Sequence, residues 1–417
     1  FTLGNGSIEN LLTLSDNGAV TGTSLVVGNG AGGNYNRLVV TNGGKLYGSS
    51  AGYHYIGSTA HFNTGLVSGA GSVWNMGAIR FYLGNSGASN EFWVMDNGMV
   101  TNMGSYAQYA GTIGFHIGNS AANASYNNMV ITNGGKMYVR DGHDSYLATS
   151  GGNSNRVHVT GNNSLLDFAN GTLTLIEGIG NRLIIDAGGT VKVGTVTVYG
   201  NNNTVNFNGG SLVVATMTNN TGLIFEVGDG SQLAAFKSSG GGKCHFVNGL
   251  RVNKGGTLMG VGPVVGGAVG VVITNGGTFS AGLDGVGSLT LSNTTWYGGA
   301  TNLVEISAVN GIAGVGYDTM TINIQLTLTA NGGKFVVRMD SLGGNASFAE
   351  GRNYYLKFMT FGTATTVNLS DFEVDTSTFI PGGTWWVTNL GSSLYLATTG
   401  GAPIVSSYQW DSTKTGY

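Results

Sequence analysis

Short apolar runs alternate with polar turns along almost the whole chain. The stretch from Asn36 to Tyr47 reads NRLVVTNGGKLY, and nearly the same pattern returns from Asn127 to Tyr138 as NNMVITNGGKMY. A looser copy, NRLIIDAGGTVKV, runs from Asn181 to Val193. The apolar letters change among Leu, Val, Ile and Met, whereas the Asn-Gly-Gly turn is kept in the two close copies. Such recurrence is typical of a structural unit repeated along an axis.

A second mark, an apolar residue followed by Gly and a small polar residue, sets the period. It occurs at Gly28, Gly57, Gly84 and Gly118, with a degenerate copy at Ala148, so the marks lie roughly 30 residues apart. No helical i, i+3, i+4 pattern is long enough to form crossover helices. Strands at this spacing predict the coils of a parallel β-helix, in which Asn and Gly form the corners and inward-facing Asn side chains form ladders between coils.

The pattern divides the chain into three parts. Residues 1–289 are predicted to form a parallel β-helix of about ten irregular coils, at ~4.8 Å per coil. Residues 290–400 carry longer apolar runs with larger side chains, such as Trp296, Trp385 and Trp386. We expect them to form a C-terminal β cap or small β-sandwich that covers the last coil. Residues 401–417 are a tail, a possible intersubunit strand, with Tyr408, Trp410 and Tyr417 as candidate subunit contacts.

The composition agrees with a folded, β-rich and weakly charged protein. Of the 417 residues 75 are Gly, 41% are apolar and only 9% are Asp, Glu, Lys or Arg. The apolar content is enough for a core, and the absence of a Gly-X-Y period excludes collagen. A net charge of −3 without a run of Lys or Arg argues against nucleic acid as a partner. No window approaches 18 uninterrupted apolar residues, so no membrane span is expected.

One part of the sequence resembles a known family. The run RVNKGGTLMGVGPVVGGAVGVVITNGGTFSAG, from Arg251 to Gly282, and the GSLTLSN that follows it resemble the late repeats of autotransporter-associated β-strand repeat proteins and autotransporter passenger domains. The segments GVGYDTMTINIQLTLTANGGKF and GGTWWVTNLGSSLYLATT resemble the C-terminal passenger segment of the same proteins. The resemblance implies a right-handed parallel β-helix, secreted or displayed on a bacterial surface, often as an adhesin. The chain begins at Phe1 without Met, which would fit removal of a signal peptide.

Catalytic chemistry finds little support in the sequence. Glycosidases need two carboxylates that face one bond, and the 20 acidic residues are sparsely distributed. Asp141-Gly142-His143-Asp144 is the best local candidate for acid–base or metal chemistry, but Asp-Gly is an ordinary turn pair. The alternating carboxylates Asp371, Glu373 and Asp375 could hold calcium, although a solvated strand face is the simpler interpretation. We therefore predict no enzyme activity, no cofactor and no metal, and Cys244 as a small buried apolar side chain.

Two columns of outward-facing residues are the most informative signal. If the apolar residue before each marker Gly points inward, the residue before it points outward, which gives Val26, Tyr55, Tyr82, His116 and Tyr146. On the next strand of each coil the outward residues are Val39, Trp93, Val130, His158 and Ile184. Three interpretations stay open: lateral contacts between coils, a seam for another copy of the chain, or Tyr faces that stack on sugar rings.

These columns lead to a ranked set of functional hypotheses. The first is an extracellular structural protein, a β-helical rod that self-associates into a surface fibre or layer. Its candidate contacts are Val39, Trp93, Val130, Ile184 and the aromatic tail. The second is a monomeric adhesin or glycan-binding β-helix, with Tyr55, Tyr82 and Tyr146 as glycan-stacking residues and a polysaccharide as partner. The third is an enzyme of the polysaccharide-lyase type.

Overall fold

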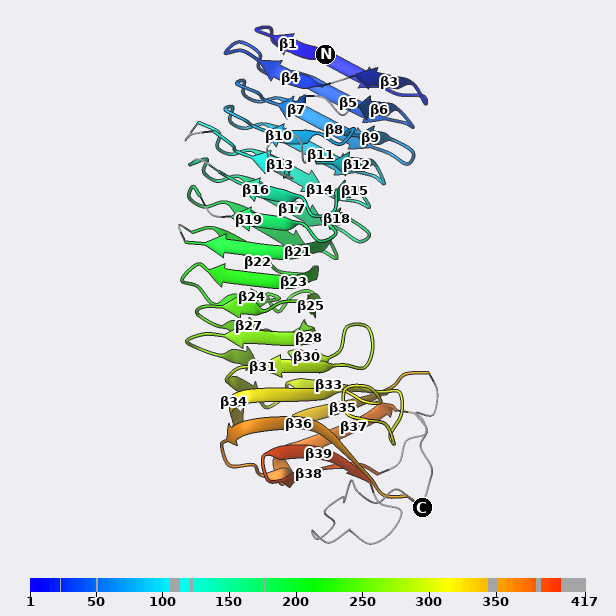
Figure 1. Ribbon diagram of the computed structural model, residues 1–417, viewed down its shortest axis with the longest axis vertical. Coiled ribbons are helices and arrows are strands. Elements are labelled where there is room, and N and C mark those ends of the chain that lie inside the picture. Colours follow the sequence, from blue (N-terminus) through cyan, green and yellow to red (C-terminus); the bar gives the residue numbers. More distant parts are fainter. Residues whose placement is uncertain are drawn as a thin grey trace.

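The computed structural model is a long stack of β-coils that ends in an antiparallel layer near the C-terminus (Figure 1). It describes the whole chain except residues 23, 50–51, 105–112, 121–122, 150, 176, 201, 344–351, 380–383 and 399–417. Successive coils pair in parallel, as between Tyr55 and Tyr82 or between Val39 and Leu66. The parallel β-helix predicted from the repeats is confirmed.

The strands of successive coils form three faces. The first face begins with β1 (Thr2–Asn5), β4 (Val26–Asn29), β7 (Tyr53–Ile56), β10 (Arg80–Leu83), β13 (Ile113–Ile117), β16 (Asp144–Leu147) and β19 (Thr172–Leu175). The second face begins with β2 (Leu11–Leu14), β5 (Arg37–Thr41), β8 (Thr64–Ser68), β11 (Glu91–Met95), β14 (Asn128–Ile131), β17 (Arg156–Thr160), β20 (Arg182–Asp186) and β22 (Thr204–Phe207). The third face begins with β3 (Ala19–Gly22), β6 (Lys45–Gly48), β9 (Val73–Asn75), β12 (Met99–Met103), β15 (Lys136–Val139) and β18 (Leu165–Asp167).

Later coils keep this plan but join strands across a corner. The long strands β21 (Thr190–Tyr199), β23 (Gly210–Asn220) and β28 (Gly256–Gly266) each run from the third face into the first. The other strands of these coils are β24 (Phe225–Val227), β25 (Ala234–Ser239), β26 (Cys244–Phe246), β27 (Leu250–Val252), β29 (Val271–Ile273), β30 (Thr278–Ala281), β31 (Ser288–Leu291), β32 (Thr294–Tyr297) and β33 (Thr301–Ile306).

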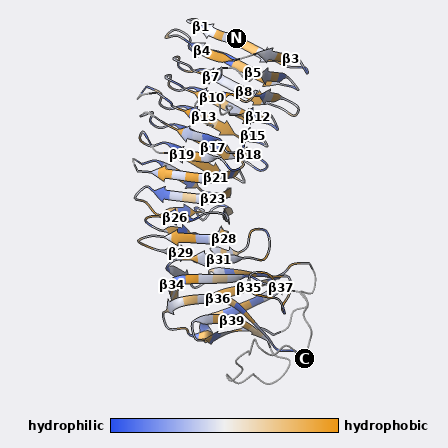
Figure 2. Cartoon of the chain, in the orientation of Figure 1, coloured by the Kyte–Doolittle hydropathy of each residue, from blue (hydrophilic) through white to orange (hydrophobic). Residues whose placement is uncertain are grey.

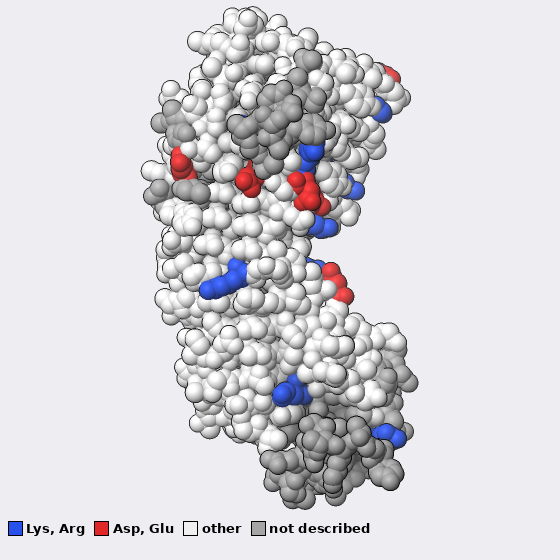
Figure 3. All heavy atoms as spheres, in the orientation of Figure 1, with Lys and Arg blue, Asp and Glu red and all other residues white. Residues whose placement is uncertain are grey.

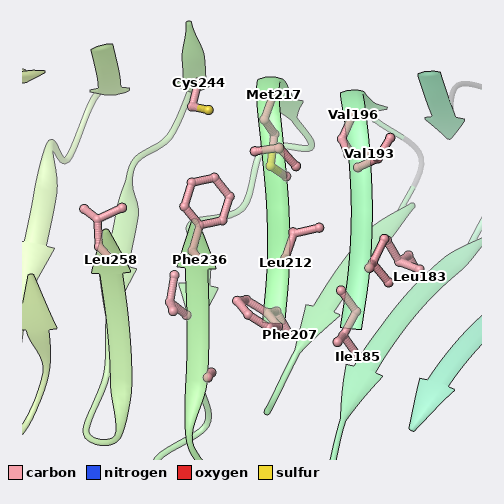
Figure 4. Packing of buried hydrophobic residues seen from close by; sticks show 14 of the residues in the cluster. Leu183, Ile185, Val193, Val196, Phe207, Leu212, Met217, Phe236, Cys244 and Leu258 are labelled. Carbon is pink, nitrogen blue, oxygen red and sulfur yellow. The ribbon is translucent and has the colours of Figure 1, made fainter. Parts of the chain in front are cut away.

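The core is one continuous cluster along the inside of the stack. Every second residue of the strands points inward, as Leu183 and Ile185 of β20 do, while Arg182 and Ile184 point outward. Hydrophobic strand segments recur along the whole stack (Figure 2). Side chains from successive coils meet in the interior, including Phe207, Phe236 and Cys244 (Figure 4). Cys244 is free and buried, as predicted, and its burial raises the pKa of the thiol to about 11.

A ladder of asparagines lines the corner between the first and second faces. The backbone N–H and the Nδ2 of each asparagine both donate to Oδ1 of the asparagine in the next coil, at 2.7–3.2 Å. Its members are Asn10, Asn36, Asn63, Asn90, Asn127, Asn155, Asn181 and Asn203. From Asn36 onward all are fully buried. The ladder predicted from inward-facing Asn is thus confirmed, and each buried amide finds partners, as burial requires.

The marker glycines make room for this ladder. Gly28, Gly57 and Gly84 have φ between +66° and +76°, and an added Cβ would lie 2.2–2.3 Å from the amide of the ladder asparagine in the following coil. Only glycine combines this backbone angle with such a close approach. The degenerate mark Ala148 keeps the left-handed angle, with φ 59°. The glycine of the second repeated mark therefore provides the space that the ladder asparagine occupies at this corner.

The Asn-Gly-Gly phrase forms the corner between the second and third faces. In Asn42-Gly43-Gly44 the first two residues have φ of 47° and 79°, which Asn and Gly tolerate. A Cβ on Gly44 would lie 2.2 Å from the carbonyl oxygen of Leu14 in the preceding coil. The same turn returns at Gly134-Gly135, where Gly135 lies against Val94 in the same way. The first Gly is needed for its backbone angle and the second for space.

The coils continue beyond the expected boundary at residue 290. Parallel pairing connects β31 to β34 (Thr319–Thr329), β33 to β35 (Phe335–Ser341), β34 to β36 (Tyr354–Ala364), and β35 to β37 (Phe372–Thr378). Trp296, which we assigned to the cap, is fully buried in the coil core beside Phe279 and Phe335. Among the strands that the structure describes, antiparallel ladders occur only where β39 (Ser393–Thr398) joins β36 and β38 (Trp386–Leu390). β38 and β39 belong to the same sheet as the coil strands, and the cap over the last coil stays a prediction.

Candidate functional site

The first outward column forms a stack of rings along the first face. The register pairs Val26 with Tyr55, Tyr55 with Tyr82, Tyr82 with His116 and His116 with Tyr146, as predicted. Neighbouring rings from Tyr55 to Tyr146 have centroids 5.0–5.1 Å apart and interplanar angles of 15–26°. The spacing follows from the ~4.8 Å separation of paired strands. The rings therefore stack face to face along the rod.

This stacking changes the expected role of the tyrosines. Both faces of Tyr82 are covered, one by Tyr55 and the other by His116, and Tyr82 is only 7% exposed. Tyr55 and Tyr146 are half-buried, and each turns one ring face toward the stack. A sugar needs an open ring face, which the stack does not leave on Tyr82, and glycan stacking at Tyr55 and Tyr146 stays a prediction. The ring contacts fit the first of the three interpretations, lateral contacts between coils.

The stack lies in a desolvated environment. Burial raises the pKa of Tyr55 to about 12, with a further contribution from Tyr82, and lowers the pKa of His116 to about 4. Nε2 of His116 is buried and finds no hydrogen-bond partner in the described chain. Arg80 is largely buried, with its guanidinium 5.7 Å from the ring centre of Tyr53. His116 is therefore neutral near pH 7 and packs as a flat ring.

The second outward column forms an apolar strip along the middle of the second face. Successive partners in the register are Thr13, Val39, Leu66, Trp93, Val130, His158, Ile184 and Asn206. Val39, Leu66, Trp93 and Ile184 are half-buried, whereas Val130 is buried. The structure thus places the predicted contacts Val39, Trp93, Val130 and Ile184 in one line. We call this line, from Val39 to Ile184, the second-face strip.

Leu66 is the member of the strip that the sequence pattern missed. It follows Gly65, which occupies an inward position where other coils carry a large apolar residue. A Cβ on Gly65 would lie 2.4 Å from Cδ1 of Ile56 and 3.0 Å from Phe92, so neighbouring side chains fill that space. Since glycine is typical of turns, Gly65 interrupts the apolar alternation, and the pattern did not predict the β8 strand. Counting one repeat from Val39 would have found it.

The edges of the second face are polar, with mainly positive charge where the strands begin and negative charge where they end; the exception is Glu91, which begins β11. Arg37, Arg156 and Arg182 lie where their strands begin, and Asp186 lies at the end of its strand. Asp96 follows the end of β11 and accepts a hydrogen bond from Ser68 Oγ at 2.9 Å. Within the strip His158 Nε2 lies 3.0 Å from Asp186. Trp93 Nε1 donates to Glu91 at 3.0 Å. An apolar centre with a polar edge is the usual anatomy of a protein–protein interface.

A groove interrupts the second face where the asparagine ladder ends. The ladder of strands stops at β22, and the next strand, β24, pairs with β27 instead. A Gly228 N–H to Phe207 carbonyl bond of 2.9 Å connects the two sides. The groove encloses about 240 Å³ and is lined mainly by Asn206, Phe207, Thr221, Phe225, Glu226 and Asp229. Its size fits a small ligand or ordered water, but its walls hold no paired acid and base.

The candidates for catalysis or metal binding are not brought together. His143 Nδ1 lies 2.8 Å from the Asp141 carbonyl oxygen, and Asp141 Oδ1 accepts the backbone N–H of Asn170 at 3.2 Å. The first is a contact within a turn and the second joins adjacent coils. A hydrogen bond from the side chain of Ser377, together with one from its backbone N–H, holds the pKa of the Asp375 carboxyl below the usual range. In the part of the chain that the structure describes, no three His, Cys, Asp or Glu side chains are grouped so as to hold a metal ion.

Two further predictions concern the chain ends and the membrane. Tyr408, Trp410 and Tyr417 lie outside the described residues, so their role in subunit contact stays a prediction. Over the described ranges, no helix is both long and apolar enough to cross a membrane.

Comparisons with known proteins add little. No protein-family model matches the chain. No curated protein matches its sequence. One similar solved structure is the TibC-catalyzed hyper-glycosylated TibA55-350 fragment, with a TM-score of 0.31 and 18% identity over 90% of this chain and 97% of that chain. A TM-score this low leaves function to be argued from the surface of the chain itself.

Proposed function

We propose that the chain is an extracellular, non-enzymatic structural protein: a β-helical rod that associates side by side with other copies through the second-face strip. The observation that carries the proposal is the line of Val39, Leu66, Trp93, Val130 and Ile184 on an outer sheet face. In a sheet with one solvated face, each strand normally alternates apolar residues that point inward with polar residues that point outward. An apolar line on the outside is the mark of a contact surface.

The dimensions of the strip suit a modest interface. Five-residue strands such as β5, β8 and β20, stacked over about six coils, give a face of roughly 17 by 29 Å. This area is below the ~800 Å² per partner of a standard interface, so a single contact is expected to be weak. A fibre or layer gains stability from many such contacts. The sparse charge of the visible surface limits repulsion between copies (Figure 3).

The charged edges favour one arrangement of two rods. A two-fold axis parallel to the rods places the strand-start edge of one copy against the strand-end edge of the other. Arg182 of one copy then lies opposite Asp186 of its partner, because both residues belong to β20. An axis perpendicular to the rods places Arg37, Arg156 and Arg182 opposite a second row of arginines. Like charges across an interface are unfavourable, so we propose that the rods associate in parallel.

Sedimentation of the full chain over a wide concentration range tests the proposal. We expect reversible association, weakened at least tenfold, about 1.4 kcal/mol, by Trp93→Lys. Tyr199→Lys is the matched control, because Tyr199 is an exposed aromatic residue at the end of β21, away from the strip. A wild-type chain that stays monomeric at millimolar concentration would contradict the proposal, as would equal effects of the two variants.

The order of the charges provides a second test. Arg182→Asp and Asp186→Arg should each weaken association, and the double variant should restore it if the rods are parallel. In an antiparallel pair residue 182 faces the arginine row of the other copy, so Arg182→Asp alone would strengthen association instead of weakening it. The ends of the rod and the aromatic tail could add further contacts, which these variants leave intact.

The two other hypotheses make different predictions. A monomeric adhesin or glycan-binding rod would stay dispersed and bind a polysaccharide. A lyase-type enzyme would degrade uronic-acid polymers, and Asp141→Asn or His143→Ala would abolish that activity. The dispersed carboxylates of the described chain favour the non-enzymatic proposal.

A further inference from the structure

The corner between the first and second faces carries a series of left-handed residues, of which the aromatic members are exposed. Each lies immediately before an asparagine of the ladder, in the loops at the left edge of Figure 1. Tyr35, Phe62, Ser89 and Tyr126 have φ of 59°, 58°, 56° and 59°. Backbone N–H groups of Tyr35, Phe62 and Ser89 each donate to a carbonyl of the next coil, at 3.0–3.4 Å. The side chains therefore leave the corner in the same direction in successive coils.

Folding alone does not account for the aromatic residues at this position. A bulky side chain at positive φ is a genuine conformational outlier and costs on the order of 1 kcal/mol or more. The next coil has the small residue Ser154 at the same place, with φ 56°, and the two coils after it use Gly180 and Asn202, which relieves the strain. Burial does not compensate, since Tyr35, Phe62 and Tyr126 are 54%, 48% and 66% exposed. Strained residues with exposed rings indicate a role outside folding.

Ser89 leaves a gap in the row of rings. Tyr35 and Phe62 stack with centroids 5.1 Å apart and an interplanar angle of 7°. Ser89 occupies the next coil, and Tyr126 the coil after that. The corner positions of Phe62 and Tyr126 are thus two coils, or roughly 10 Å, apart along the rod. One flat ring fits between them at the spacing that Tyr35 and Phe62 already show.

The chemistry around the gap is neutral and rich in hydrogen-bonding groups. The corner segments 28–36, 57–63, 84–90 and 123–127 contain no Asp, Glu, Lys or Arg, and consist mainly of Gly, Asn, Ser, Thr and Ala. His61 Nδ1 accepts the N–H of Ala88 at 2.9 Å, so neutral His61 carries its proton on Nε2 as a donor. These segments carry no charge, and the Glu91 carboxylate directly follows one of them; both features disfavour phosphates and uronic acids, and the scarcity of aliphatic side chains disfavours a protein seam.

We propose that the gap at Ser89, between Phe62 and Tyr126, binds one pyranose ring of a neutral glycan. The ring presents its apolar C–H face to Phe62 and its hydroxyls to the amides and hydroxyls of the corner. The aromatic ring supplies area at low entropic cost, and the polar groups supply orientation. This site is separate from Tyr55, Tyr82 and Tyr146, and it does not depend on association through the second-face strip.

Saturation-transfer NMR with the full chain and methyl glycosides of neutral hexoses tests the proposal. Affinity for one ring is expected near 1 mM or weaker, so the probes are used up to about 50 mM. We expect transfer to the C–H face of at least one glycoside. Ser89→Phe fills the gap and Tyr126→Ala removes one wall, so each should reduce binding at least tenfold. Tyr199→Ala is the matched control and should not change it.

Each outcome either supports or overturns glycan binding at Ser89. Ser89→Phe is expected to fold, because Phe62 already has the same residue type and backbone angle, and Tyr126→Ala gives an independent test if it does not. The proposal is overturned if wild type shows no transfer to any neutral glycoside, or if Ser89→Phe binds as wild type does. Trp93→Lys should leave glycoside binding intact, and Ser89→Phe should leave association intact, so failure of this site and failure of the proposed function are distinguishable.

Discussion

The coils before residue 208 and those after it share one corner and differ at another. Both halves turn from the second to the third face through left-handed residues, as at Gly43 in the first half and Gly276 in the second. Among the residues that the structure describes, only the first half has the asparagine ladder, which ends at Asn203. Where the ladder ends, the pairing of the second face is interrupted and a groove opens. A repeated turn is therefore enough to build coils, whereas the ladder fixes how adjacent coils meet at the other corner.

The two halves also bury different titratable groups. His54 and His116 are buried in the first half, and burial lowers the pKa of each to about 4. His54 accepts the N–H of Leu25 at 3.1 Å, and its other nitrogen lies 3.0 Å from the Met76 carbonyl oxygen. In the second half Asp318 is 2% exposed, and burial raises its pKa to about 7 although Gly287 and Glu305 donate backbone N–H groups to it. The halves should respond to pH in opposite directions.

Breaking the ladder should have the largest effect. Asn127→Ala removes the acceptor of the Asn90 backbone N–H and leaves that buried group without a partner. We expect a loss of about 3 kcal/mol in the free energy of unfolding, with faster hydrogen exchange confined to coils near residue 127, since solenoid coils contact mainly their neighbours. Asn302→Ala is the control in the second half, because Oδ1 of buried Asn302 already lacks a partner in the described chain. Equal losses of stability in the two variants would show that the ladder hydrogen bonds contribute no more than those of any other buried asparagine.

Crowding the ladder should have the next largest effect. Gly84→Ala places a Cβ 2.2 Å from the Asn127 amide at φ +66°, whereas Gly222→Ala has similar backbone strain, at φ +77°, and open space around it. We expect the positive φ to destabilise both variants. Gly84→Ala should lose roughly 2 kcal/mol more in the free energy of unfolding, because the added Cβ overpacks a buried site. Urea unfolding of the pair isolates the contribution of the ladder. A difference near zero would mean that Asn127 moves aside freely.

A change of pH should alter the stability of the two halves in opposite directions, with a smaller effect than the ladder variants have. The lowered pKa values of His54 and His116 mean that the unfolded chain binds more protons, so their contribution to stability is complete above pH 6.5 and is lost as the pH falls toward 4. At pH 5 the loss is about 2 kcal/mol for each His. The raised pKa of Asp318 acts in the opposite sense, since its contribution is complete below about pH 4 and is lost as the pH rises through 7. Glu305 beside it raises that pKa further.

Hydrogen exchange, corrected for intrinsic rates, measures both effects in one sample. Between pH 6.5 and 4.5 the coils around His54 and His116 should lose protection while those around Asp318 gain it. Asp318→Asn should abolish the response of the second half and leave that of the first. The same direction of change in both halves would contradict this account.

Removing one ring from the stack should have the smallest effect. Tyr146→Leu deletes the last ring of the stack, which lies 5.0 Å from His116. A stacked pair contributes on the order of 1 kcal/mol beyond its burial, so we expect a loss of that size in the free energy of unfolding. Tyr199→Leu changes an exposed tyrosine in the same half and should have almost no effect. Similar losses in the free energy of unfolding for the two variants would mean that the stacked rings follow from the strand register and add no stability of their own.

Local patterns determined much of what the sequence revealed. The parallel β-helix followed from the recurrence of Asn-Gly-Gly and of the marker glycines, since left-handed corners depend on a few adjacent residues. The two outward columns followed from alternation along each strand, because side chains of a β-strand point to opposite faces in turn. Leu66 was missed because Gly65 occupies an inward position, where only neighbouring coils show that the space is filled.

Tertiary structure alone decided what the columns and corners can do. Alternation placed Tyr82 on the outside, but only the stacking of coils showed that Tyr55 and His116 cover its faces. Trp296 was assigned to a cap from its size, yet parallel pairing continues past it. The left-handed angles of Tyr35, Phe62 and Tyr126 have no signature in the residues themselves. Burial, ring contacts and strain depend on residues one coil away, about 20 to 40 positions along the chain, and a local pattern does not carry that information.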